Sequence, residues 1–167
     1  MKMLSLLRHA DASWSNPSLS DFDRPLNMQG EKDAALMGDR LHVQGVQPGQ
    51  IVSSPALRAI TTASIMAGAL HRDSRQILRI PSIYEASLND LMEVVRGFDD
   101  QLEHVLLVGH NPGLSMLASI LTGQRYNLPT CAFLSLTLVI DEWPELMPGV
   151  GREQVCFSPG DIHSGTA

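Results

Sequence analysis

The residues best suited to chemistry in this sequence are two histidines and two arginines that follow three predicted strands. Arg8 and His9 come directly after an apolar stretch. His110 follows a second such stretch, and Arg58 lies just beyond a third. Guanidinium groups match phosphate oxygens in pairs, and a neutral imidazole offers a nucleophilic lone pair. Because ligands of open α/β sheets sit beyond the carboxyl ends of the strands, we expect these side chains to form one anion site that favours a phosphoryl group.

The elements that must position these residues alternate between strand and helix patterns. Strands are predicted at 4–7, 50–53, 76–80, 105–108, 133–140 and 154–157, and helices at 27–42, 55–70, 87–95 and 114–121. The uninterrupted apolar run at 105–108 is typical of a central parallel strand that is covered on both faces. This order predicts an α/β protein with three layers, α/β/α, and a mostly parallel central sheet. The last strands lack crossover helices and are expected to run antiparallel.

Composition limits the class of protein. The chain has 167 residues, of which 44% are hydrophobic, and a formal charge of −6. These values are typical of one compact domain, so we expect a single domain over 1–167 with an irregular tail, rich in Pro and Gly, from about residue 141. The negative charge argues against a general partner among nucleic acids or anionic membranes, which attract basic surfaces.

The N-terminus and the cysteines carry no sign of export or of a metal centre. The apolar start, Met3 to Leu7, is too short for a signal peptide or a membrane span, which favours a cytoplasmic protein. Cys131 and Cys156 lack the CxxC spacing of a metal or redox site and are predicted to be small buried hydrophobic residues. Met37, Met66 and Met116 are expected to be packing residues rather than a cofactor site.

Three short blocks, in this order, resemble the signature of the histidine phosphatase superfamily. They are Leu7-Arg8-His9-Ala10, Ser53-Ser54-Pro55 with Arg58, and Val108-Gly109-His110-Asn111-Pro112. The segments 21–26 and 83–87 are similar to the small SixA-type phosphohistidine phosphatases, and the likeness extends to about Phe157. The resemblance implies a phosphoglycerate mutase-like fold.

The same resemblance implies roles for four residues. His9 would attack phosphorus and form a covalent phosphohistidine, which water then hydrolyses. Arg8, Arg58 and His110 would hold the phosphoryl oxygens as charge develops, without a metal or another cofactor. His110 is expected to act as a donor, preferably in its protonated form. A backbone carbonyl that binds the other ring nitrogen of His9 would fix its tautomer.

Four further residues are candidates for the site, and three of them have two interpretations each. Glu85 lies where larger members of the superfamily carry a proton donor, but it is equally read as a solvated carboxylate at a helix start. Arg24 is a candidate phosphate contact, with a pairing to Asp21 or Asp23 as the alternative. Asn111 is a candidate substrate-binding residue because it follows His110. Asp11 is a second candidate acid, although a role in ordering the loop after His9 is favoured.

The short segment 84–103 leaves little room for an inserted lid, so the pocket is expected to be shallow. Such a pocket suits a phosphorylated side chain on a protein surface better than a small sugar phosphate. Together with the resemblance, this implies protein phosphohistidine or another phosphoprotein as the substrate. A small-molecule phosphoesterase or a mutase of the same superfamily is the alternative. Two other hypotheses are a phosphoprotein-binding module without catalysis, and a metal-dependent hydrolase that uses His9, Asp11 and His110 as ligands. The sequence is silent on oligomeric state.

Overall fold

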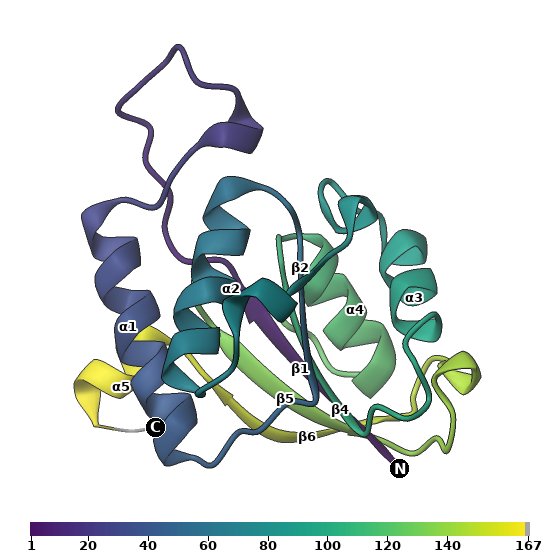
Figure 1. Ribbon diagram of the computed structural model, residues 1–167. Helices are drawn as coiled ribbons and strands as arrows, with labels where there is room; N and C mark the ends of the chain where they lie inside the picture. Colours follow the sequence, from purple (N-terminus) through teal and green to yellow (C-terminus); the bar gives the residue numbers. More distant parts are fainter. Residues whose placement is uncertain (166–167) are drawn as a thin grey trace.

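The computed structural model, which describes residues 1–165, has a six-stranded mixed sheet with helices on both faces (Figure 1). The strands are β1 (Lys2–Arg8), β2 (Gln50–Ser53), β3 (Leu78–Arg79), β4 (His104–Gly109), β5 (Phe133–Leu138) and β6 (Gly151–Phe157). The helices are α1 (Met28–Val43), α2 (Leu57–Ala69), α3 (Leu88–Arg96), α4 (Gly113–Thr122) and α5 (Pro159–Ser164). The predicted α/β class is confirmed. Within the described residues, no helix is both long and apolar enough to cross a bilayer.

The strand order places three strand ends side by side. The order is β3-β2-β4-β1-β5-β6. Strands β3, β2, β4 and β1 run parallel to one another, whereas β5 is antiparallel to both β1 and β6. In this register Arg8 lies opposite Gly109, and Ser53 lies opposite Val108. The residues that follow β1, β2 and β4 therefore emerge at one edge of the sheet.

Both faces of the sheet are buried, because apolar residues alternate between two cores. Leu4, Leu6 and Val105 pack with the apolar sides of α3 and α4. Leu7 and Leu106 pack on the opposite face with α1 and α2. The predicted continuous apolar strand at 105–108 is thus completely buried, as its position at the centre of the sheet requires.

Capping side chains and a glycine define the helix ends near the site. The Asn27 side chain caps α1 by accepting a hydrogen bond from the Gly30 amide at 2.7 Å. Gly45, with φ of 70°, lies just beyond the end of this helix. Ser87 caps α3 in a reciprocal arrangement with Asp90. These local contacts fix where the loops at the site begin and end.

Three predicted boundaries were wrong. Pro55 precedes α2 rather than occupying its first turn, because the helix begins at Leu57. The strand predicted at 76–80 is only the two-residue β3, since Ser74–Gln76 forms a 3-10 turn and the strand pairs on one side alone. The tail from 141 is more regular than predicted, because β6 begins at Gly151 and is followed by α5.

Two residues predicted to be buried are exposed. Cys156 is exposed because β6 is an edge strand whose residues are largely exposed, whereas Cys131 is buried as predicted. Met116, on the outer face of α4, is 45% exposed, whereas Met37 and Met66 lie in the core. Helical spacing alone did not separate the outer face of α4 from its buried face.

Two helical glycines differ sharply in their surroundings, which gives a test of how α1 supports the loop after His9. A Cβ atom at Gly30 would lie 2.1 Å from the carbonyl oxygen of Asp11, whereas a Cβ atom at the exposed Gly68 would meet nothing within 4 Å. We expect Gly30→Ala to lower the free energy of unfolding by about 1–3 kcal/mol. Gly68→Ala should leave it unchanged or raise it by up to about 1 kcal/mol. Urea unfolding of both variants checks this, and equal stabilities would contradict it.

Candidate active site

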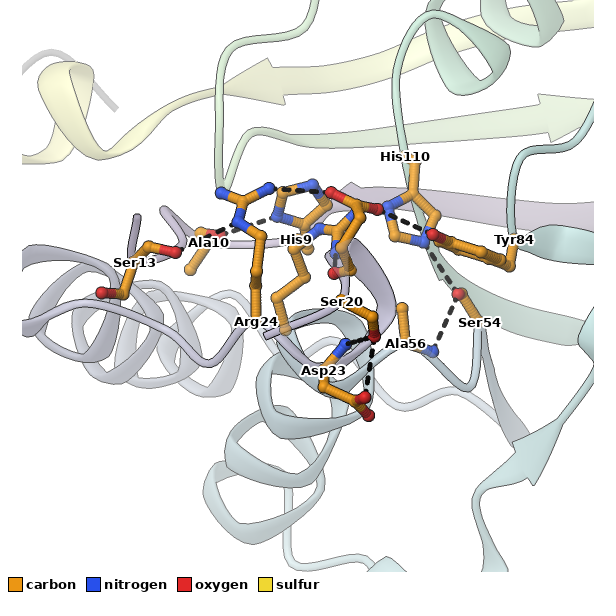
Figure 2. Close-up of polar contacts among 12 residues, drawn as sticks. His9, Ala10, Ser13, Ser20, Asp23, Arg24, Ser54, Ala56, Tyr84 and His110 are labelled. Atoms are coloured by element: carbon orange, nitrogen blue, oxygen red, sulfur yellow. Dashed lines mark hydrogen bonds and ion pairs between the residues drawn. The ribbon is translucent and has the colours of Figure 1, made fainter. Parts of the chain in front are cut away.

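Strands β1, β2 and β4 are each followed by a polar residue of the site. These residues are His9, Ser54 and His110, and the aligned strand ends bring them together. The ring centroids of His9 and His110 are 5.0 Å apart. Figure 2 shows Arg24 on one side of His9 and Tyr84 beside His110. Two imidazoles thus face each other at the edge predicted from the sequence.

His9 is held as a neutral imidazole with a defined tautomer. Its Nδ1 lies 2.7 Å from the carbonyl oxygen of Ala10. A carbonyl only accepts hydrogen bonds, so Nδ1 carries the proton and Nε2 keeps a free lone pair. Burial lowers the pKa of His9 to about 4, with a smaller contribution from nearby arginines, Arg58 foremost. His9 therefore offers a nucleophilic nitrogen at neutral pH.

His110 is buried as well and offers a donor. Burial, followed by its proximity to His9, lowers the pKa of His110 to about 3, so the predicted preference for a protonated ring is not met in the free protein. Its Nε2 lies 2.7 Å from Oγ of Ser54, an oxygen that also accepts a hydrogen bond from the Ala56 amide. We assign the Ser54 hydroxyl proton to Nε2, which leaves the proton of His110 on Nδ1. This Nδ1 is buried and has no hydrogen-bond partner among the described residues.

Arg8 and Asn111 are both tied to the loop before β5. Nη1 of Arg8 and Nδ2 of Asn111 donate to the carbonyl oxygen of Leu128 at 3.0 and 2.7 Å. The Asn111 amide oxygen accepts from the Ser115 hydroxyl at 2.8 Å, so both ends of this side chain have structural partners. Its role in substrate binding stays a prediction. Nε of Arg8, in contrast, is buried with no partner in the described part of the chain.

The carboxylate of Asp21 links the other cationic side chains. Its Oδ2 accepts from Nη2 of Arg58 at 3.0 Å and from the Tyr84 hydroxyl at 2.7 Å. Its Oδ1 accepts from Nη1 of Arg24 at 3.0 Å. The bond from Tyr84, followed by those from the two arginines, lowers the pKa of Asp21 to about 2. Burial and the bond to Asp21 raise the pKa of Tyr84 to about 12, so Tyr84 is a neutral donor.

Arg24 has the carboxylate pairing that was the alternative interpretation, and its role as a phosphate contact stays a prediction. It pairs with Asp21, not with Asp23, whose carboxylate instead accepts from Ser20. Its guanidinium also stacks on the Trp14 ring, with Cζ 3.3 Å from the ring centroid. Arg24 contributes to the lowered pKa of His9, which places its charge near the candidate nucleophile.

Glu85 is exposed and lines a cavity of about 400 Å³ together with His110. It is not part of the start of α3, because that helix begins at Leu88 and is capped by Ser87. Its φ of 54° turns the chain at this point. The helix-start interpretation of Glu85 is therefore wrong, whereas its role as a proton donor stays a prediction.

Asp11 orders the loop after His9, in line with the interpretation favoured from the sequence. Its carboxylate accepts from Nδ2 of Asn27 at 2.7 Å and from the Ala12 amide at 3.1 Å. These bonds fasten β1 to the start of α1.

Across residues 1–165, no group of three or more His, Cys, Asp or Glu side chains is placed to hold a metal ion.

Two residues of the site were given no role from the sequence: Tyr84 as a donor to Asp21, and Ser54 as the partner of His110. Asp21 was named only as a possible partner of Arg24, not as the link to Arg58 and Tyr84. Ser54 was detectable, since it follows β2 as His9 follows β1. The contact between Asp21 and Tyr84 joins positions 63 residues apart, so no local spacing in the sequence indicated it.

The two lowered histidine pKa values generate a titration prediction. Protonation of His9 is expected only as the pH falls through about 4, instead of the ordinary value of 6.5. Because Nε2 must be unprotonated to attack, protonation of His9 should lower kcat/KM only near that acidic pH. Ring-nitrogen NMR of the free protein, with His9→Asn to assign the signal, measures the midpoint. A midpoint near 6.5 would show that His9 is not desolvated as described.

Comparison with known proteins agrees with this geometry. The model of the histidine phosphatase superfamily (branch 1) matches residues 4–94, more than half of the chain. An uncharacterized chloroplastic protein of Arabidopsis thaliana is 33% identical over 152 residues, which cover 86% of this chain and 70% of that protein.

Solved structures point to the same group. The protein histidine phosphatase SixA, complexed with tungstate, superposes with a TM-score of 0.82 at 24% identity, covering 96% of this chain and 99% of that one. A structure from Agrobacterium tumefaciens, assigned as a phosphohistidine phosphatase SixA, has a TM-score of 0.80 at 26% identity and covers 95% of this chain and 99% of its own. With its fold and strand-end residues, the chain belongs to the histidine phosphatase superfamily as a SixA-like phosphatase.

Proposed function

We propose that this protein removes phosphoryl groups from protein phosphohistidine through a covalent intermediate on His9. One observation carries the proposal: the free Nε2 of a neutral, buried His9 lies in a cluster with two buried nitrogens that lack hydrogen-bond partners among residues 1–165, Nε of Arg8 and Nδ1 of His110. The first is a donor, and the tautomer assigned to His110 makes the second a donor as well. Buried donors are normally satisfied, and a tetrahedral oxyanion would satisfy both. That SixA is known in complex with tungstate, an oxyanion, supports this interpretation.

In the first step Nε2 of His9 attacks phosphorus. A P–N bond to His9 forms, and the bond from phosphorus to the leaving group breaks with its electron pair on the leaving group. Arg8 and His110 donate to the equatorial oxygens, while Arg58 and Arg24 supply positive charge around them. The carbonyl of Ala10 keeps the His9 ring oriented and stabilises the charge that the ring gains.

In the second step water attacks the phosphoryl group of the intermediate. The P–N bond to His9 breaks, inorganic phosphate leaves, and Nε2 regains its lone pair. A phosphohistidine substrate suits this site because an imidazole is a better leaving group than an alkoxide and needs less help from an acid. The exposed position of Glu85 agrees with this, because a phosphohistidine substrate does not require Glu85 to protonate the leaving group.

The site opens toward solvent beside Asp21, whose side chain is 47% exposed. A phosphorylated side chain on a protein surface can approach from this side. Small phosphoesters remain the alternative substrates, and a panel of phosphohistidine protein, phosphoserine and phosphotyrosine peptides, and small phosphoesters compares them directly.

His9→Ala is expected to lower turnover of a histidine-phosphorylated protein by at least about 10⁴-fold, because it removes the nucleophile. The matched control is His42→Ala, an exposed histidine on α1 outside the site, which should leave turnover unchanged. Circular dichroism confirms that both variants are folded. Wild-type turnover by His9→Ala would refute the mechanism, and loss of wild-type turnover after exhaustive chelation would favour the metal-dependent alternative.

Glu85→Gln tests the proton donor. If Glu85 protonates leaving groups, the variant should lose about 100-fold or more in kcat on a phosphoserine peptide, whose alkoxide leaves poorly. The loss on p-nitrophenyl phosphate and on phosphohistidine should be small, because these leaving groups need little protonation. A uniform effect on all three substrates, or none, would remove Glu85 from the chemistry.

A further inference from the structure

The loop 12–25, between β1 and α1, carries an unusual share of the exposed aromatic surface. It extends away from the body of the protein beside the site edge (Figure 1). The chain has two Trp and four Phe residues. Trp14 and Phe22, both in this loop, are 77% and 37% exposed, whereas the rest are buried, namely Trp143, Phe98, Phe133 and Phe157. Leu19, 38% exposed, adds to the same loop. Exposed aromatic side chains of this kind are enriched where proteins bind partners.

These aromatic side chains are held in place by the candidate active site. Trp14 stacks on Arg24, and Arg24 binds Asp21. Phe22 meets the Tyr84 ring edge-on at 5.1 Å, and Tyr84 binds the same Asp21 carboxylate. The aromatic surface and the cations are thus parts of one connected network, and the side chains lose little further freedom when a partner binds.

The base of the loop is also fixed. Ala12 and Leu26 form an antiparallel bridge, and the Ser13 amide donates to the Pro25 carbonyl at 2.8 Å. The loop therefore presents Trp14 and Phe22 from a defined position next to positive charge. Trp14 and Phe22 form an apolar rim beside the positive charge of the site. Such a rim complements a phosphorylated side chain that is surrounded by apolar residues.

We propose that the loop 12–25 docks the phosphoprotein substrate, with Trp14 as the main anchor for apolar side chains beside the phosphorylated residue. This inference rests on the proposed phosphatase function. It assigns substrate selection to a surface separate from His9. The phosphoryl group binds at the strand ends, and the part of the substrate protein around it packs on the apolar rim.

The test compares two substrates of the same enzyme: a globular protein phosphorylated on histidine with phosphoramidate, and p-nitrophenyl phosphate. Trp14→Ala should lower the ratio of the kcat/KM value for the protein to that for p-nitrophenyl phosphate by about tenfold or more, since a Trp that a partner covers is a typical anchor of an interface. Trp14→Phe should restore part of the ratio. The matched control, Val43→Ala, removes a side chain of equal exposure, 76%, from the opposite end of α1 and should leave the ratio unchanged. Asp21→Asn should lower both activities together, because it loosens Arg58.

Three results would overturn the inference. Wild-type kcat/KM values on both substrates in Trp14→Ala would show that the rim does not contact the protein substrate. An equal fall in both kcat/KM values would mean that Trp14 acts only through Arg24. A wild-type dimer that dissociates in Trp14→Ala with no change in the ratio, seen by sedimentation, would assign the rim to a second copy of this chain. If the wild-type protein hydrolyses neither substrate, the proposed function itself fails, and this inference fails with it.

Discussion

Parallel pairing of β1 and β2 on either side of β4 is the constraint on which the site depends. The register sets the ends of these strands level, so that His9, Ser54 and His110 leave the sheet together. Apolar helices cover both faces of the sheet, as is typical where strands are parallel. The fold thus places two imidazoles 5.0 Å apart, although they follow two different strands, β1 and β4.

Charge balance around these imidazoles is the second organising feature. Desolvation, with a smaller contribution from nearby arginines, keeps His9 and His110 neutral, which gives the site one lone pair and, with the tautomer assigned to His110, one ring donor. Repulsion among the cations is offset by one carboxylate, Asp21, which binds Arg58 and Arg24 at once and stays ionised. The same carboxylate fastens the loop 12–25 to the active site, so the surface proposed to meet the substrate and the groups proposed to act on it are held by one residue.

Much of this arrangement followed from local sequence signals. Apolar runs predicted β1 and β4, helical spacing predicted helices that start near residues 27 and 87, and the polar residues after strands predicted the edge where the site lies. Interactions between distant segments were not predictable in this way. Nothing local indicates that Asp21 meets Tyr84, or that β3 is cut to two residues because it pairs with one neighbour only.

The central claim is that His9 carries the phosphoryl group between substrate and water. Rapid acid-free quenching during turnover of a histidine-phosphorylated protein, followed by mass spectrometry of proteolytic peptides, measures this directly. We predict an acid-labile phosphoryl adduct on the peptide that contains His9, formed in the wild-type protein and absent from His9→Asn. Steady turnover with no adduct on that peptide at any time point, or an adduct on His110 instead, would contradict the account.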